Sequence, residues 1–165
     1  MRWRLALLAA PLLLAAVGCG SKGAVAIVAS IEMPHASVEN SALIRLLKGD
    51  FTLHIELGQY APTSTDVSVL SMALVRAGDQ ATLVVPKLAS TPPPPYHLEP
   101  GAHVDAAIIV SESNGTPGQS IVQTDYDAIC LTPTVQVTGT LSDTASGSPT
   151  QVSSMTFGVT GCPPP

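Results

Sequence analysis

The chain has 165 residues, of which 45% are hydrophobic and only 12% are charged, and its formal net charge is −5. This length predicts one domain, and the low charge content excludes a charge-rich disordered chain. Seven Lys and Arg against twelve Asp and Glu argue against a nucleic-acid-binding protein, which needs cationic side chains to neutralise phosphates. Thirteen Gly, fifteen Pro and only 4% aromatic residues are typical of short strands joined by many turns.

The N-terminal residues have the composition of an export signal. Arg2 and Arg4 precede an uncharged apolar run over residues 5–17, which only Pro11 interrupts. This run is shorter than the roughly 20 residues of a membrane-spanning helix, and it fits the apolar region of a signal peptide. We therefore expect the chain to be exported.

The sequence from Ala16 to Cys19 resembles the lipobox of bacterial lipoproteins, in which a small residue precedes a lipidated Cys. The resemblance implies a signal peptide over 1–18, cleavage after Gly18, a lipid on Cys19 and a short tether over 19–23. Ala16 departs from the family pattern, which most often has Leu three residues before the Cys. The alternative is an ordinary secretory signal with an Ala-x-Ala-like cleavage site and an incidental Cys.

The residue after the lipobox Cys bears on the location. Gly20 stands there, whereas Gram-negative lipoproteins retained in the inner membrane often have Asp, so the resemblance implies the outer membrane. Cleavage leaves five basic against twelve acidic side chains, a net charge of −7, which repels anionic headgroups and nucleic acid. The lipid is therefore the expected membrane contact, and an envelope protein or glycan the expected partner.

Alternating and apolar runs dominate the mature chain and predict strands. The alternating residues Phe51, Leu53, Ile55 and Leu57 share one face, as in a half-buried antiparallel strand. The predicted strands are 24–31, 51–57, 66–75, 81–88, 103–111, 121–124, 129–141 and 151–161. Residues 90–99 include four consecutive prolines at 92–95, which predict a connection that crosses from one sheet to the other.

One segment has a helical pattern. Residues 41–48 place Leu43, Ile44, Leu46 and Leu47 in an apolar stripe, with Asn40 or Ser41 as the N-cap and Gly49 beyond the C-terminus. Eight residues make only a marginal helix. The alternative is a strand with a hairpin turn at 48–50.

Seven or eight short strands predict an all-β fold, an antiparallel two-sheet Ig-like sandwich over 24–162 with at most one short helix, followed by the Pro tail 163–165. The turn at 98–101, Leu-Glu-Pro-Gly, resembles one in Ig-like modules of bacterial surface proteins. Parity within each strand predicts the core. The predicted core residues are Leu53, Ile55, Val67, Val69, Leu83, Val85, Ile108, Val135, Val137 and Phe157.

Two cysteines remain after the lipobox. Cys130 and Cys162 lie in a chain expected to reach an oxidising compartment, which predicts a disulfide across the last hairpin. The same register aligns apolar pairs. These predicted pairs are Val135 with Phe157, Val137 with Met155 and Pro133 with Val159.

Three His-x-acid pairs are the main candidates for chemistry. They are His54 with Glu56, His97 with Glu99, and His103 with Asp105. On a strand, residues two apart share a face, so each pair is suited to chelate a metal or orient an imidazole. Alternation of apolar and polar positions also produces such pairs without any chemistry, and this is the interpretation that we favour.

The remaining motifs are interpreted as structure. Asp125 and Asp127 resemble half of a calcium site but lack further ligands, so we expect a solvated loop. Asn114-Gly115 predicts a turn, and the four prolines predict a stiff loop.

The sequence lacks the common nucleophile, metalloprotease and nucleotide motifs. We expect a non-catalytic binding or structural module in the cell envelope, without cofactor or metal. The alternative is a small metal-binding protein or metal-dependent periplasmic enzyme that uses the His-x-acid pairs.

Overall fold

The computed structural model describes residues 27–41, 43–112, 114–132 and 134–164. The predicted cleavage after Gly18, the lipid on Cys19 and the tether that follows it lie outside the described residues. So does the first part of the strand predicted over 24–31.

The described chain is almost entirely β-structure, which confirms the all-β class. It contains eleven strands and one short helix. In chain order these are β1 (Ile27–Asn40), β2 (Arg45–Leu57), β3 (Thr65–Arg76), β4 (Thr82–Val84), β5 (Leu88–Thr91), β6 (Tyr96–Leu98), β7 (His103–Val110), β8 (Gln119–Ser120), α1 (Gln123–Leu131), β9 (Thr134–Asp143), β10 (Thr150–Ser153) and β11 (Phe157–Thr160). No helix in this part of the chain has the length and apolar character needed to cross a membrane.

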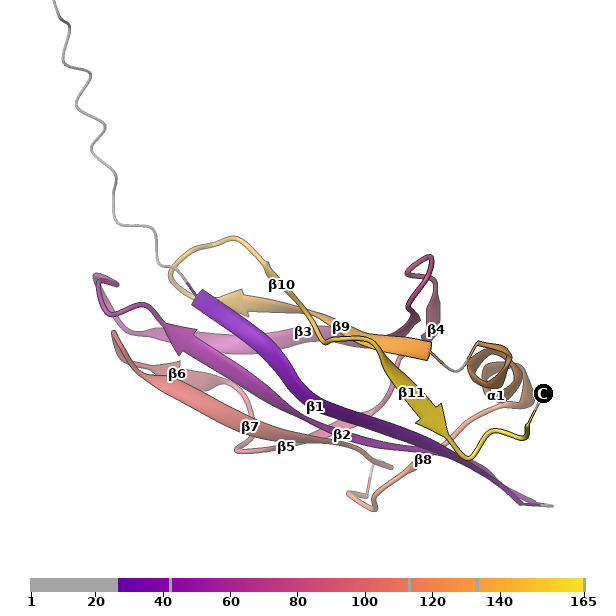
Figure 1. The fold of residues 1–165 in the computed structure, drawn as a ribbon. Helices are drawn as coiled ribbons and strands as arrows, with labels where there is room; N and C mark the ends of the chain where they lie inside the picture. The colour runs from indigo at the N-terminus through magenta and orange to yellow at the C-terminus, as the bar shows by residue number, and fades with distance from the viewer. Residues whose placement is uncertain (1–26, 42, 113, 133, 165) are drawn as a thin grey trace, which may run out of the picture.

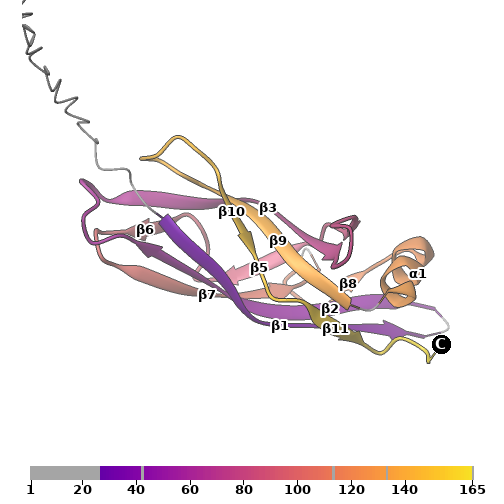
Figure 2. The same cartoon turned by 45° about the horizontal axis from the view of Figure 1, so that its top comes forward.

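The strands form one curled, mixed sheet. Its hydrogen-bonded order is β4-β3-β9-β11-β1-β2-β7-β5, with β6 beside β3, β8 beside β2 and β10 beside β9. β11 runs parallel to β1, whereas it pairs antiparallel with β9. Figure 1 and Figure 2 show β3 and β9 lying over β1, β2 and β7, with α1 at one end of the sheet. The half that contains β3 and β9 and the half that contains β1, β2 and β7 face each other, and their inward side chains form one hydrophobic core.

β2 follows the predicted alternation, but it is longer than predicted. Phe51, Leu53, Ile55 and Leu57 are all buried. The strand begins at Arg45, so the helix predicted over 41–48 is wrong.

The residues before β2 form the hairpin turn instead. The N–H of Ser41 donates to the carbonyl of Ile44, so the turn lies before the predicted 48–50. Within β2, Gly49 pairs with Ala36 of β1, and a Cβ on Gly49 would lie 2.7 Å from the carbonyl oxygen of His35. Long-range pairing therefore outweighs the weak local preference for helix in this segment.

The only helix among the described residues lies where strands were predicted. α1 spans Gln123–Leu131 and replaces the strand predicted over 121–124 and the start of the one over 129–141. It buries Tyr126 and Ile129, which are three residues apart and so share a helix face. Two buried residues are too few to produce a recognisable helical repeat of apolar residues in the sequence.

Two predicted strands are divided. The segment predicted over 81–88 contains β4 and only the first residue of β5, Leu88. Val85 between them is 64% exposed, so its assignment to the core is wrong. Pro86 follows Val85 and offers no N–H for a sheet hydrogen bond. This local change ends the alternation that predicted Val85 to be buried.

The segment predicted over 151–161 forms β10 and β11, with Ser154 between them. The register on β9 shifts by one residue between the pairs Ser153–Thr138 and Phe157–Val135, and at this point the N–H of Val137 donates to the hydroxyl of Ser154. Phe157 pairs with Val135 as predicted, but the Val137–Met155 pair is wrong because Met155 is 73% exposed.

The other predicted core residues lie inside or at the edge of the core. Fully or nearly buried are Leu53, Ile55, Val67, Leu83, Ile108, Val135 and Val137. Val69 and Phe157 are half-buried and pack against this core. A register shift in β3 between Val69 and Ser71 reverses the alternation, so that Met72 is buried on the side where odd-numbered residues such as Val67 were buried before it.

The proline-rich connection is shorter than the predicted 90–99, because residues 90–91 belong to β5 and residues 96–98 form β6. It leaves β5, which pairs with β7, and enters β6, which pairs with β3. It therefore carries the chain from one half of the curled sheet to the other.

Candidate functional site

The most concentrated group of predicted site residues lies on the outer face of β2 and β7. His54 pairs with Asp105 and Glu56 pairs with His103 across these two antiparallel strands. Their neighbours along each strand, such as Ile55 and Ala106, are buried, so alternation directs the four polar side chains outward. We call these four residues, His54, Glu56, His103 and Asp105, the β2–β7 histidine face.

His54 is the most enclosed side chain of the salt-bridged histidines. Its Nδ1 lies 2.6 Å from Oδ1 of Asp105, and its side chain is 28% exposed against 56% for Asp105. A carboxylate only accepts hydrogen bonds, so Nδ1 is the donor and Nε2 of a neutral ring keeps its lone pair. The ring of His103 lies close by, with centroids 5.6 Å apart and an interplanar angle of 32°.

The third His-x-acid pair is isolated from this face. On β6, Nδ1 of His97 lies 2.8 Å from Asp66 of β3, and Nε2 lies 3.3 Å from Glu99. The hydrogen bond with Asp66 is the main cause that raises the pKa of His97, and the bond with Glu99 adds to it. Both ring nitrogens are therefore engaged by carboxylates.

The fourth histidine was not a candidate from the sequence. Nδ1 of His35 on β1 lies 3.5 Å from Asp50 of β2, and both side chains are largely exposed. A register shift between Glu32 and His35 brings His35 opposite Asp50. Pro34 interrupts the strand pattern in the sequence, so only knowledge of the β1–β2 pairing could have predicted this pair.

No third ligand completes a metal centre in the geometry observed. Across residues 27–164, positions 42, 113 and 133 apart, no group of three or more His, Cys, Asp or Glu side chains is arranged to hold a metal ion. The β2–β7 histidine face thus offers two neighbouring imidazoles with carboxylates beside them.

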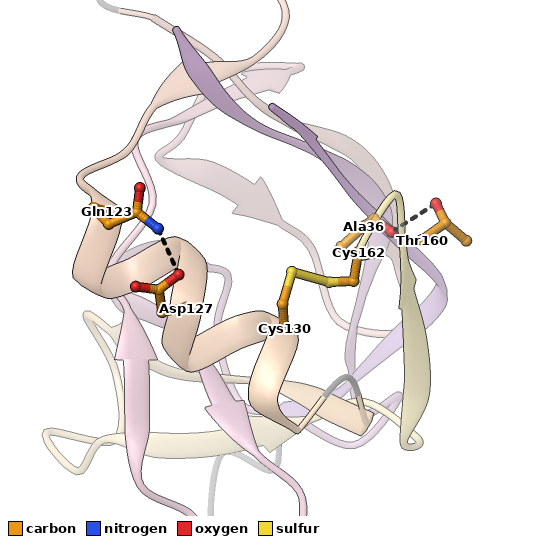
Figure 3. Close-up of a disulfide and its surroundings, with 6 residues drawn as sticks. All are labelled: Ala36, Gln123, Asp127, Cys130, Thr160 and Cys162. Atoms are coloured by element: carbon orange, nitrogen blue, oxygen red, sulfur yellow. Dashed lines mark hydrogen bonds between the residues drawn. A yellow bond between two sulfur atoms is a disulfide. The ribbon is translucent and has the colours of Figure 1, made fainter. Parts of the chain in front are cut away.

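The predicted cysteine pair meets at the end of the sheet that carries α1. The Cα atoms of Cys130 and Cys162 lie 5.3 Å apart and a disulfide joins the two residues, which agrees with the 4.4–6.8 Å that a bridge requires. Figure 3 shows that it ties α1 to the segment after β11, beside the point where the hydroxyl of Thr160 donates to the carbonyl of Ala36. The disulfide therefore fastens a helix, not a hairpin strand, to the C-terminal segment.

The acidic pair predicted in a loop lies on α1. Asp127 accepts a hydrogen bond from the side-chain amide of Gln123 one turn earlier (Figure 3). Asp125 and Asp127 are two residues apart, and such residues do not face each other on a helix. The expectation of a solvated loop is wrong, and the two carboxylates do not form half of a calcium site.

The predicted Asn-Gly turn is confirmed. Gly115 has a φ of 81°, which favours glycine. The side chain of Asn114 accepts a hydrogen bond from the N–H of Thr116 at 3.0 Å.

A mostly apolar cavity opens between β3 and β6 on one side and β5 and β7 on the other. It has a volume of about 240 Å³ and is lined by Val69, Met72, Leu88, Ser90, Pro94, Tyr96 and Ile108. The hydroxyls of Tyr96 and Ser90 lie 2.6 Å apart. Burial raises the pKa of Tyr96, and the hydrogen bond with Ser90 partly offsets this.

Comparison with known proteins gives no further assignment. No protein-family model, no curated protein and no solved structure matches the chain.

Proposed function

We propose that this protein is a lipid-anchored, non-catalytic binding or structural module of the bacterial cell envelope, in which the strands form a two-layer Ig-like sandwich. The observation that carries the proposal is the pairing of Cys130 with Cys162 at a Cα separation of 5.3 Å. Disulfides persist in oxidising compartments outside the cytosol. This pairing uses the two cysteines other than Cys19, which agrees with a separate role for the lipobox Cys.

The ionisable residues of the sheet have a structural role that supports a non-catalytic module. Three cross-strand contacts join a histidine to a carboxylate. They are His35 with Asp50, His54 with Asp105, and His97 with Asp66. Polar side-chain pairs across neighbouring strands contribute to the stability of a sheet, so these residues have a physical reason to be present without a reaction.

Two features support the two-layer arrangement. The halves of the sheet enclose one hydrophobic core. The connection between β5 and β6 passes from the β7 side to the β3 side, as a crossover between layers does.

The position of β1 suggests which end of the domain would lie near the membrane and which would lie away from it. β1 begins at the end of the sheet opposite to α1 and the C-terminus (Figure 1, Figure 2). Cys19 precedes Ile27 by eight residues, a reach of at most about 29 Å. A lipid on Cys19 would therefore leave α1 and the β1–β2 turn facing away from the membrane, toward an envelope protein or glycan.

The anchor is tested by labelling cells with a radioactive or clickable palmitate analogue. The Cys19→Ser variant is expected to remain an unprocessed precursor without label, because the acceptor thiol is lost. The matched control is Cys130→Ser, which removes a different cysteine and should keep the label. Equal labelling of Cys19→Ser and the wild type would contradict the proposal.

The location is tested by membrane fractionation in a Gram-negative host. Wild-type protein is expected in the outer-membrane fraction, and Gly20→Asp should shift it to the inner membrane. Cross-linking of both forms in intact envelopes then identifies a protein or glycan partner that contacts only the outer-membrane form. Identical fractionation of the two forms would contradict the predicted location.

A further inference from the structure

The relation between His54 and His103 goes beyond a simple cross-strand pair. His103 lies two residues before Asp105, the partner of His54, so the two imidazoles are diagonal neighbours on adjacent strands. Diagonal neighbours remain within reach of aromatic and long side chains. The two rings come from different His-x-acid pairs, which are distant in the sequence and meet only in the folded sheet.

The separation of the rings fits a shared metal ion. An imidazole nitrogen binds an ion such as zinc at about 2.0–2.1 Å, so two rings on one ion have centroids roughly 4.5–5.5 Å apart. The observed separation is 5.6 Å. His103 is exposed, so its ring has room to change rotamer when it binds an ion.

The environment of His54 is that of an oriented metal ligand. A histidine that binds a metal through one nitrogen usually donates its other N–H to a carboxylate, which fixes the ring and increases its basicity. Asp105 accepts this bond from Nδ1 of His54 at 2.6 Å, which in the neutral ring leaves the lone pair of Nε2 for a metal. His97 is the opposite case, because carboxylates engage both of its nitrogens.

We propose that His54 and His103 form a surface chelate for one divalent transition-metal ion, with Asp105 as the positioning residue for His54 and water in the other coordination positions. Two protein ligands make an open site from which the metal exchanges. Among divalent first-row ions, Cu²⁺ binds such nitrogen ligands most tightly. The proposal is independent of the lipid anchor and of the envelope role.

The test uses the full protein as isolated from the producing cells, stripped of metal with a chelator and titrated with Cu²⁺ by calorimetry and electron paramagnetic resonance at pH 7.5. We expect one Cu²⁺ per chain with hyperfine coupling to two nitrogens. His54→Gln and His103→Gln should each weaken binding at least about tenfold, and Asp105→Asn by about 10–100-fold. The matched control, His97→Gln, should bind as the wild type does.

Two results would overturn the proposal. One is stoichiometric two-nitrogen Cu²⁺ binding that persists in the double variant His54→Gln/His103→Gln. The other is a wild-type protein that binds no more Cu²⁺ than this double variant. His103→Gln keeps the assay decisive if His54→Gln perturbs folding, because His103 is exposed and lies outside the His54–Asp105 contact.

Discussion

Gly161 occupies a position where a residue with a side chain is poorly tolerated. Its φ is 84°, and a Cβ there would collide with the carbonyl oxygen of Val38 on β1. A left-handed backbone alone costs a non-glycine residue about 1–3 kcal/mol. We therefore expect Gly161→Ala to lower the free energy of unfolding by about 2 kcal/mol, as measured by urea denaturation.

The matched control for this prediction is Gly78→Ala. Gly78 has an ordinary φ and open space around its Cβ position, so the change should stay within about 0.5 kcal/mol. Equal effects of the two substitutions would show that the conformation at Gly161 is not a constraint.

His97 provides a pH-dependent prediction. Hydrogen bonds with Asp66 and Glu99 raise the pKa of His97 above its usual 6.5. The protonated ring therefore stabilises the fold below pH 6.5, and this contribution is lost as the pH rises through the higher, folded-state pKa. An NMR titration of the His97 ring should show Asp66→Asn lowering its pKa toward 6.5, and an unchanged titration would contradict the assignment of Asp66 as the main cause.

At the scale of residues, alternation predicted burial well wherever a strand keeps its register. Leu53, Ile55 and Val67 are buried because period two places them on the inner face. Val69 and Val85 were predicted less well, since a register shift and a proline interrupt the period beside them. The closeness of His54 and His103 depends on the pairing of β2 with β7, which no local pattern contains.

The register between β9 and the last two strands gives a prediction at the scale of elements. Phe157 is half-buried opposite Val135, whereas Met155 is largely exposed. We expect Phe157→Ala to cost about 2–3 kcal/mol, below the roughly 3–5 of a fully buried Phe. Met155→Ala should change stability by no more than about 0.5 kcal/mol.

Denaturation of both variants distinguishes the observed register from the uninterrupted hairpin predicted from the sequence. A cost for Met155→Ala that equals the cost for Phe157→Ala would favour the uninterrupted hairpin. In the observed register the hydroxyl of Ser154, rather than the backbone of Met155, accepts the N–H of Val137.

The helix α1 and the β1–β2 hairpin show why individual helices and strands were harder to predict than the all-β fold class. α1 has no side-chain hydrogen bond at its N-cap residue, Val122, so it lacks the usual signal of a helix start. Residues 41–48 have an apolar stripe in the sequence, but residues 45–48 pair with β1, and residues 46–47 also pair with β8. In both segments tertiary contacts outweigh local preference.

At the scale of the whole molecule, the disulfide fastens the C-terminal segment. It joins residues 32 positions apart, and a loop of this size gives about 3–4 kcal/mol in the loop-entropy model. We expect Cys162→Ser to lower the free energy of unfolding by this amount and to make it insensitive to dithiothreitol. If dithiothreitol left the stability of the wild-type protein unchanged, the pairing would not hold in solution.

The parallel pairing of β1 with β11 also makes closure of the sheet depend on residues that are far apart in the sequence. Thr160 and Ala36, which are 124 positions apart, meet on these two strands, and β11 is the link between β9 and β1 in the strand order. Such non-local pairing is typical of domains that fold in milliseconds to seconds. A chain without residues 157–160 would therefore lack the strand that links β9 to β1.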